Sequence, residues 1–152
     1  MKVIGIRVKP SEVIYAILDT ETIEVVVVSK LKLPKALDLP KQLSFIRNNF
    51  LDIFREYDII KAGIRITEPT AQKPDLKRIQ IESVIQEMFS SCTLENYYIG
   101  QIASITNKIN IPREDFKRYV NNEITFEGID KWNEHSKEER EALLTALGTI
   151  NV

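Results

Sequence analysis

Three short segments of the sequence carry the charged side chains that are best suited to chemistry. Glu138 and Glu141 lie in the acidic run Glu-Glu-Arg-Glu near the end of the chain. Arg7 and Arg65 each follow the dipeptide Gly-Ile in two separate apolar segments. Carboxylates are hard oxygen ligands that suit Mg²⁺, whereas guanidinium groups only donate hydrogen bonds and bind carboxylates or phosphates. The chemistry therefore depends on which of these groups the fold brings together.

The elements that must position these side chains follow from the spacing of apolar residues. Alternating or continuous apolar runs bounded by turn residues predict strands, and apolar residues at helical spacing predict helices. The predicted strands cover 3–8, 13–18, 23–29, 59–66 and 94–99. The predicted helices cover 38–57, 74–91, 101–108, 113–120 and 137–148.

Several residues carry specific local predictions. Asp38 is expected to cap the first helix, and Ser136 followed by Glu139 has the pattern of a capping box. Gly63 inside a strand predicts a close approach by another backbone or a ligand. The four valines at 25–28 are apolar on both faces, which favours a strand that is covered on both sides. In the irregular segment 121–135, Trp132 is expected to pack as one large aromatic side chain.

Length and composition describe an ordinary globular chain. With 152 residues, 43% hydrophobic and 28% charged, we expect a single domain over 1–152 with a substantial core. A net charge of −1 does not by itself ensure a basic surface, so nucleic acid would have to contact a local basic patch. The single cysteine suits a reducing compartment, and no apolar run is long enough for a membrane span. We therefore expect a cytoplasmic protein without a membrane partner.

The order of the predicted elements is β-β-β-α-β-α-β-α-α-α. This order predicts an α/β fold with a mixed five-stranded sheet, in which an antiparallel meander is joined by two parallel strands and flanked by helices. The same order occurs in the RNase H-like superfamily. The segments Val-Ile-Gly-Ile at 3–6, Lys-Ala-Gly-Ile at 61–64 and the acidic helix at 138–147 resemble the first strand, fourth strand and last helix of RuvC Holliday junction resolvases. The resemblance spans nearly the whole chain.

The departures from the RuvC pattern concern its metal-binding acids. In that family an aspartate follows the first-strand Gly-Ile and a glutamate follows the fourth strand, but here those positions are Arg7 and Arg65. Two-metal nucleases hold two Mg²⁺ ions about 3.5–4 Å apart with a cluster of carboxylates. Only Glu138 and Glu141 keep the character of the family's acids. The resemblance thus implies a vestigial site of Arg7, Arg65, Glu138 and Glu141 with no confident catalytic residue and no metal.

Three interpretations of the two arginines remain open from the sequence. They can form partly buried ion pairs with Glu138, Glu141 or both, so that fixed cations stand where metal ions would. They can bind nucleic-acid phosphates in the former substrate groove. They can also be ordinary solvated charges. Further candidates for a nucleic-acid surface are Lys73, Lys77, Arg113 and Lys117, although acids are interleaved with them and a solvated charged face is favoured.

The remaining reactive residues have simple structural interpretations. The glutamates in the first turn of the last helix are favoured by its macrodipole whatever their function. His135 is the only histidine and is expected at the surface, and Cys92 has no base nearby. The sequence holds no zinc ligand set, no P-loop and no dinucleotide-binding fingerprint, so no cofactor is expected.

The function that the sequence favours is a non-catalytic RuvC/RNase H-like domain that binds or assembles with another protein, within a nucleic-acid-handling system. A homodimer is implied by the RuvC resemblance. One alternative is a metal-dependent, structure-selective endonuclease with Mg²⁺ held by a displaced cluster of Asp19, Glu68, Glu138 and Glu141. The other is a nucleic-acid-binding protein without catalysis.

Overall fold

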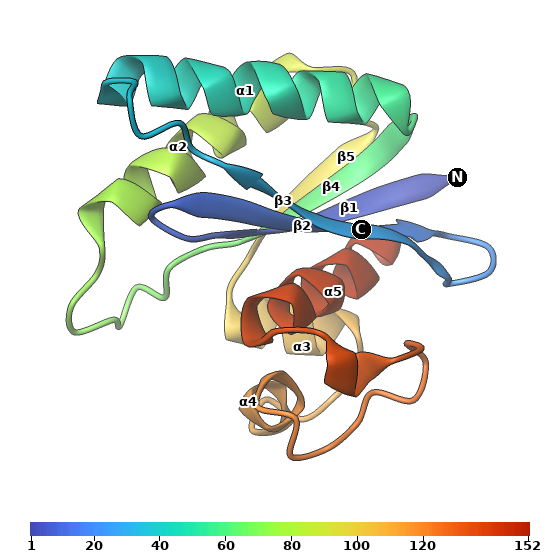
Figure 1. Cartoon of the computed structure of the whole chain (residues 1–152). Coiled ribbons are helices and arrows are strands. Elements are labelled where there is room, and N and C mark those ends of the chain that lie inside the picture. The colour runs from blue at the N-terminus through green and yellow to red at the C-terminus, as the bar shows by residue number, and fades with distance from the viewer.

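The computed structural model describes residues 1–152 and is built on one twisted mixed sheet (Figure 1). The strand order is β3-β2-β1-β4-β5, in which β1, β2 and β3 form an antiparallel meander and β4 and β5 run parallel to β1. The predicted α/β architecture is therefore confirmed. The strands are β1 (Lys2–Val8), β2 (Glu12–Asp19), β3 (Val25–Lys32), β4 (Ile59–Arg65) and β5 (Asn96–Gly100).

Helices cover both faces of the sheet in two separate layers (Figure 1). One layer holds α1 (Leu39–Glu56) and α2 (Leu76–Ser91), and the aromatic rings of Phe50, Phe54 and Phe89 pack in sequence between them and the sheet. In the opposite layer α5 (Lys137–Ile150) lies on the sheet, and shorter elements pack around it. These shorter elements are α3 (Ile102–Lys108), α4 (Asp115–Val120) and the 3₁₀ turn η1 (Trp132–Glu134).

The helix starts follow the capping residues in the sequence. The Asp38 carboxylate accepts a hydrogen bond from the Lys41 amide at 3.1 Å, and Ser136 forms the predicted capping box with Glu139. Helix α2 starts at Leu76, two residues later than predicted, because the Asp75 carboxylate accepts from the Arg78 amide at 2.8 Å and so fixes the cap.

Two glycines in register allow α5 to lie directly on the centre of the sheet. Gly5 of β1 pairs with Gly63 of β4, and both face α5. A Cβ atom at Gly5 would collide with the backbone of Ala142 and Ala146, and one at Gly63 with the side chains of Tyr98 and Thr149. The close approach expected at Gly63 is therefore made by the chain itself. It places the N-terminal half of α5 against the ends of β1 and β4.

The prediction that the valine strand is covered on both faces is met only in part. Val27 and Leu31 pack against the core on one face of the sheet, and Val25 and Val28 against the core on the other. β3 is nevertheless an edge strand and none of its residues is buried, whereas six of the eight residues of neighbouring β2 are. The strand also begins at Val25 rather than at residue 23. Ile23 lies in the left-handed region with φ of 59° because the turn from Asp19 to Glu24 is closed by hydrogen bonds to the Asp19 carboxylate.

The irregular segment before α5 packs around Trp132, as predicted. The Trp132 ring is 1% exposed and lies against Tyr119 and Phe126. Its Nε1 donates to the Tyr119 carbonyl at 3.1 Å, while Arg140 of α5 donates to the Trp132 and Val120 carbonyls. None of the helices is both long and apolar enough to cross a membrane.

Candidate functional site

The two arginines lie side by side at the same end of the sheet. Arg7 near the end of β1 is the register partner of Arg65, the last residue of β4. Side chains alternate between the faces of a strand, so Arg7 and Arg65 share the α5 face with Gly5 and Gly63, two residues earlier. The identical Gly-Ile-Arg triplets thus combine a close approach by α5 with two cations directed at its N-terminal half.

The carboxylate of Glu141 lies between these two cations. Its Oε2 atom accepts a hydrogen bond from Nε of Arg7, and its Oε1 atom lies 3.7 Å from Nε of Arg65. The three side chains are 16%, 8% and 11% exposed for Arg7, Arg65 and Glu141, so the pairs are largely desolvated. Each carboxylate oxygen therefore has its own guanidinium partner.

Arg65 is the most enclosed member of this group. Its Nη1 lies 3.5 Å from Oε1 of Glu68, and its guanidinium carbon lies 5.5 Å from the centre of the Phe116 ring. Burial lowers the pKa of Arg65, and the charges of Glu141 and Glu68 oppose that shift. Glu68 is itself fixed, because it accepts the Ile102 amide at 2.7 Å at the start of α3. The ion pair with Glu141 thus joins β4 to α5, the cation–π contact with Phe116 reaches α4, and Glu68 links Arg65 to the start of α3.

Glu138 does not join this cluster. Its carboxylate lies 4.0 Å from Nζ of Lys9 and is 31% exposed, and Lys9 also lies 3.5 Å from Glu12 of the same hairpin. Of the two last-helix acids considered in the sequence, the structure brings only Glu141 to the arginines. Glu138 belongs to a solvated ion-pair group at the rim, where exposed pairs contribute little.

A second buried ion pair beside the arginines was missed by the sequence analysis. Nε of Arg78 lies 2.8 Å from Glu82, whose buried carboxylate also accepts the amide and hydroxyl of Thr67 at the end of β4. Burial lowers the pKa of Arg78, and the neighbouring charge of Arg7 adds to that shift. The available signal was the four-residue spacing of Arg78 and Glu82 on one helix face. With this pair, three guanidinium groups face three carboxylates: Arg7, Arg65, Arg78, Glu68, Glu82 and Glu141.

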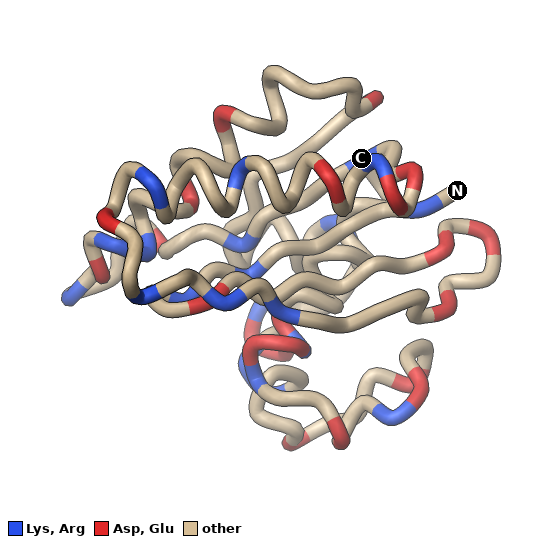
Figure 2. The backbone as a smooth tube through the Cα atoms, turned by 45° about the horizontal axis from the view of Figure 1, so that its top comes forward, with Lys and Arg blue, Asp and Glu red and all other residues tan.

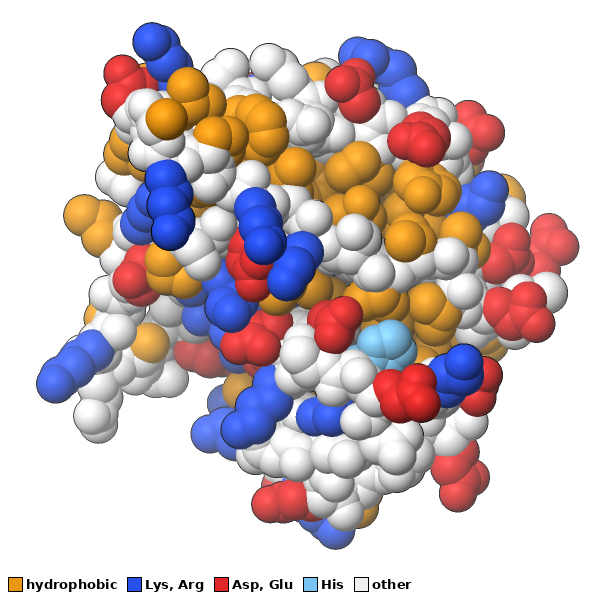
Figure 3. Space-filling model, in the orientation of Figure 1, with side chains coloured by type: hydrophobic (Ala, Val, Ile, Leu, Met, Phe, Trp, Pro, Cys, Tyr) orange, Lys and Arg blue, Asp and Glu red, His pale blue; other side chains and the backbone are white.

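The other basic candidates lie apart from this cluster. Lys73 is exposed in the loop before α2, and Lys77 lies partly exposed in the first turn of α2. Arg113 and Lys117 are exposed on the opposite layer, before and within α4. Basic and acidic residues are interspersed along the chain in Figure 2, and the face shown in Figure 3 likewise mixes the two signs. The structure therefore presents no single basic surface formed by these four residues.

The carboxylates do not fit the Mg²⁺ site that the RuvC resemblance implies. No group of three or more histidine, cysteine, aspartate or glutamate side chains is arranged to hold a metal ion. Asp19 pairs with Lys2 at the start of β1, five residues from Arg7, which is roughly 16 Å along the strand. Both oxygens of Glu141 face arginines, and Glu68 faces Arg65 and an amide. Asp19, Glu68, Glu138 and Glu141 are thus not one cluster.

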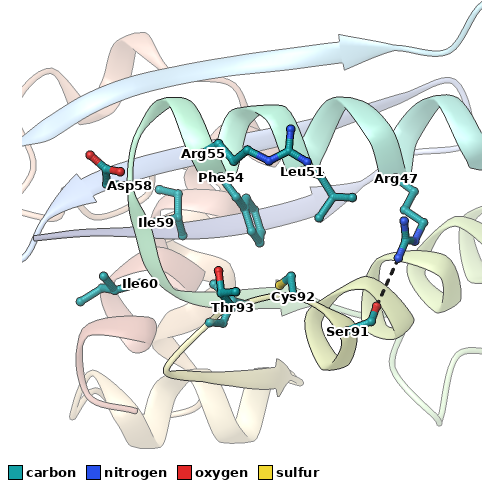
Figure 4. A pocket seen from close by; sticks show the side chains of 11 residues that line it. Arg47, Leu51, Phe54, Arg55, Asp58, Ile59, Ile60, Ser91, Cys92 and Thr93 are labelled. Carbon is teal, nitrogen blue, oxygen red and sulfur yellow. Dashed lines mark hydrogen bonds between the residues drawn. The ribbon is translucent and has the colours of Figure 1, made fainter.

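None of the principal cavities is lined by Arg7 or Arg65, although one of about 280 Å³ is lined by Glu68 and Glu82 of the carboxylate cluster. The largest, of about 570 Å³, lies at the start of β4 between the ends of α1 and α2, at the opposite end of that strand from Arg65 (Figure 4). Cys92 lines it, and Arg47 donates to the Ser91 hydroxyl at 3.3 Å at its rim. His135 lines a separate surface hollow beside the β2–β3 turn. Neither Cys92 nor His135 touches the carboxylate cluster.

The strand order, the crossovers and the position of α5 define an RNase H-like fold of the RuvC type. RuvC from Thermus thermophilus superposes with a TM-score of 0.73 over 97% of this chain and 92% of that chain, at 11% identity. The same protein in complex with a Holliday junction substrate gives a TM-score of 0.69 at 12% identity and the same coverage. The yeast mitochondrial Holliday junction resolvase Ydc2 gives 0.57 over 98% of this chain and 77% of that chain, at 13% identity.

The sequence itself carries no comparable signal. No family model matches it, and no curated protein matches it significantly. The RuvC-like fold expected from the order of elements is confirmed by structure alone. The TM-scores of 0.57–0.73 establish the fold, whereas identities of 11–13% leave the chemistry to be argued from the site.

Proposed function

We propose that this chain is a RuvC-like domain that does not cleave nucleic acid and serves as a binding or assembly component of a nucleic-acid-handling system. The observation that carries the proposal is the arrangement at Glu141. Its two carboxylate oxygens each face an arginine, and the arginines are register partners on β1 and β4. The RuvC resemblance implies acids at these two strand positions. Fixed guanidinium groups there repel divalent cations instead of binding them.

The packing around the pair supports the same conclusion. Cleavage by a metal nuclease needs space for two ions, the scissile phosphate and an attacking water. None of the five principal cavities is lined by Arg7, Arg65 or Glu141. The site is filled by its own ion pairs, so it stabilises the join between the sheet and α5.

A cleavage assay tests the proposal directly. The purified chain is incubated with four-way junction, single-stranded and duplex DNA and RNA in Mg²⁺ or Mn²⁺. The expected result is no cleavage above a buffer control. Cleavage that is lost in Glu141→Ala and kept in Glu138→Gln would overturn the proposal. A contaminating nuclease would act with both variants, and the Glu138 variant shows whether the effect is specific to the buried carboxylate.

Nucleic-acid binding without cleavage is the second candidate, because RuvC, whose fold this chain shares, has been solved with a Holliday junction substrate. Arg7 and Arg65 are engaged with carboxylates, so exposed Lys73, Lys77, Arg113 and Lys117 would have to supply the phosphate contacts. Binding is measured by fluorescence anisotropy between about 50 and 200 mM salt, where each lost phosphate contact lowers the log–log slope by about 0.9 for duplex DNA. A slope unchanged in the four alanine variants would assign binding elsewhere.

A further inference from the structure

The largest cavity lies between the second half of α1 and the segment 91–94 that follows α2 (Figure 4). Its volume of about 570 Å³ is within the range that is typical of sites for small molecules. None of the other principal cavities has as many apolar residues in its lining. The apolar residues that line it are Leu51, Phe54, Ile59, Ile60, Cys92 and Leu94.

The floor of this cavity is the edge of the core between the sheet and the α1–α2 layer. Phe54 and Ile59 belong to that core and are 7% and 8% exposed. Leu51 and Leu94 pack against the same core but stay partly exposed. An apolar group in the cavity would cover the exposed parts of these two leucines, and removing apolar area from water is favourable.

Two arginines stand at the rim of the cavity on the α1 side. Arg47 and Arg55 lie one helical turn before and after Leu51, so the three residues share one face of the helix (Figure 4). Asp58 is the only acid in the lining, and it lies at the Arg55 end, where its amide donates to the Arg55 carbonyl at 3.3 Å. The lining therefore has a cation without an acid at the Arg47 end.

Arg47 is held in place and keeps unused hydrogen-bond donors. Its Nε donates to Glu87 at 3.1 Å and its Nη2 to the Ser91 hydroxyl at 3.3 Å, which fixes the guanidinium between the two helices. These contacts use two of the five N–H donors of an arginine. Glu87 does not line the cavity and is 57% exposed, so water weakens its pairing with Arg47. A carboxylate in the cavity can accept hydrogen bonds from the remaining donors.

We propose that this cavity binds a small carboxylate that has an apolar body. The carboxylate accepts from Arg47, and the apolar body lies over Leu51, Phe54 and Leu94. The cavity is at the opposite end of β4 from Arg65, so it is separate from the buried ion pairs. The inference goes beyond the proposed function and does not depend on whether the chain cleaves nucleic acid.

Phenylbutanoate is a suitable probe, because a short alkyl chain joins its carboxylate to an aromatic ring. Cys92 is the only cysteine and lines the cavity, so the rate at which iodoacetamide labels it reports occupancy. A ligand of about twelve non-hydrogen atoms is expected to have a Kd of about 1 mM. At about 10 mM phenylbutanoate only one molecule in about eleven is unoccupied, so labelling should slow about tenfold. Labelling is followed by intact mass spectrometry.

Matched ligands test whether the cavity selects an anion. Phenylbutanol and phenylbutylamine keep the apolar body and replace the carboxylate with a hydroxyl or an amine. The amine is the stringent comparison, because Asp58 and the carbonyl end of α2 at Ser91 both favour a cation. Both ligands are expected to bind at least about tenfold more weakly than phenylbutanoate, since neither forms the charged pair with Arg47.

Arg47→Met tests the anchoring residue, because methionine keeps an extended side chain and removes the charge. Binding about tenfold weaker is expected, so that about 10 mM phenylbutanoate slows labelling only about twofold. Arg118→Met is the matched control, since Arg118 forms an exposed ion pair with Asp115 at 2.9 Å outside the cavity. This control should bind as the unchanged chain does. Each rate is compared with that of the same variant without ligand, and circular dichroism confirms that the fold is retained.

Three results would overturn the proposal. Labelling of Cys92 that is not slowed by about 10 mM phenylbutanoate would show that the cavity does not bind this class of ligand. Equal protection by phenylbutylamine would show that the cavity does not select an anion. Undiminished protection in Arg47→Met would show that the carboxylate is not held by that guanidinium.

Discussion

Replacing Glu141 with glutamine should destabilise the fold far more than an ordinary charge deletion. The amide keeps the size of the side chain and one acceptor oxygen but removes the charge between two guanidinium groups that are only 16% and 8% exposed. Removing one partner of a buried ion pair typically costs about 3–5 kcal/mol, because the remaining charge stays buried. Arg65 retains Glu68 at 3.5 Å, so we expect about 3 kcal/mol for Glu141→Gln.

The assay is urea unfolding followed by circular dichroism, with Glu138→Gln as the matched control. Glu138 lies on the same helix, but it is 31% exposed and 4.0 Å from its lysine, so its loss should cost less than about 1 kcal/mol. A double-mutant cycle with Arg7→Met should give a coupling free energy of at least about 1 kcal/mol between Arg7 and Glu141. If Glu141→Gln costs no more than Glu138→Gln, the pair is not acting as a desolvated one and the reasoning is refuted.

Three further predictions follow from particular contacts. Gly5→Ala forces a Cβ against the backbone of α5 and should cost about 1–3 kcal/mol or more in urea unfolding, whereas Gly128→Ala, whose nearest new contact is the Phe126 side chain at 3.2 Å, should be nearly neutral. The pKa of Asp19 lies below its ordinary value because the backbone amides of Glu21 and Thr22 donate hydrogen bonds to its carboxylate. The stability that this carboxylate gives the fold is therefore present above its unfolded-state pKa and is lost as the pH falls through its folded-state pKa. Asp19→Asn should reduce the loss of folding stability at acid pH, and an NMR titration that gives Asp19 a pKa at or above about 3.9 would contradict this. Arg7→Asp combined with Arg65→Glu should create a carboxylate cluster with Glu141 whose thermal midpoint rises with added Mg²⁺, and an unchanged midpoint would show that the geometry cannot hold the ion.

The layout of the fold could be predicted because each element has a local signal. The caps at Asp38 and Ser136, the helical spacing in α1 and the turn residues between strands fix the order of elements, and that order limits the topology. The edge position of β3 could not be predicted from the valine run. Apolar residues on both faces indicate what a strand would prefer to contact, but the number of strands available on its outer side is a property of the whole sheet.

The candidate site was predictable in part for a similar reason. The repeated Gly-Ile-Arg triplet placed Arg7 and Arg65 in neighbouring strands, and the parallel pairing makes them direct neighbours. The choice of Glu141 over Glu138 depends on the rotation of α5 about its axis, which the contacts of Gly5 with Ala142 and Ala146 determine. The four-residue spacing of Arg78 and Glu82 is a local signal for their pairing, but the burial of the pair depends on the first turns of α2 lying against the end of β4, which no local pattern reports.

Arg7, Arg65 and Glu141 form one electrostatic unit, and two arrangements of charge at these three positions would be balanced. With Arg7 and Arg65 on the strands, Glu141 supplies the charge that two buried guanidinium groups need. With acids on both strands, the three carboxylates would repel one another unless metal ions lay between them. Exchanging only one of the two strand residues between arginine and acid leaves one arginine with two carboxylates, so one buried charge lacks a partner. An unpaired buried charge destabilises the fold. Under the proposed function, electrostatics would therefore favour exchanging both strand acids together, with Glu141 kept as the partner of the two arginines.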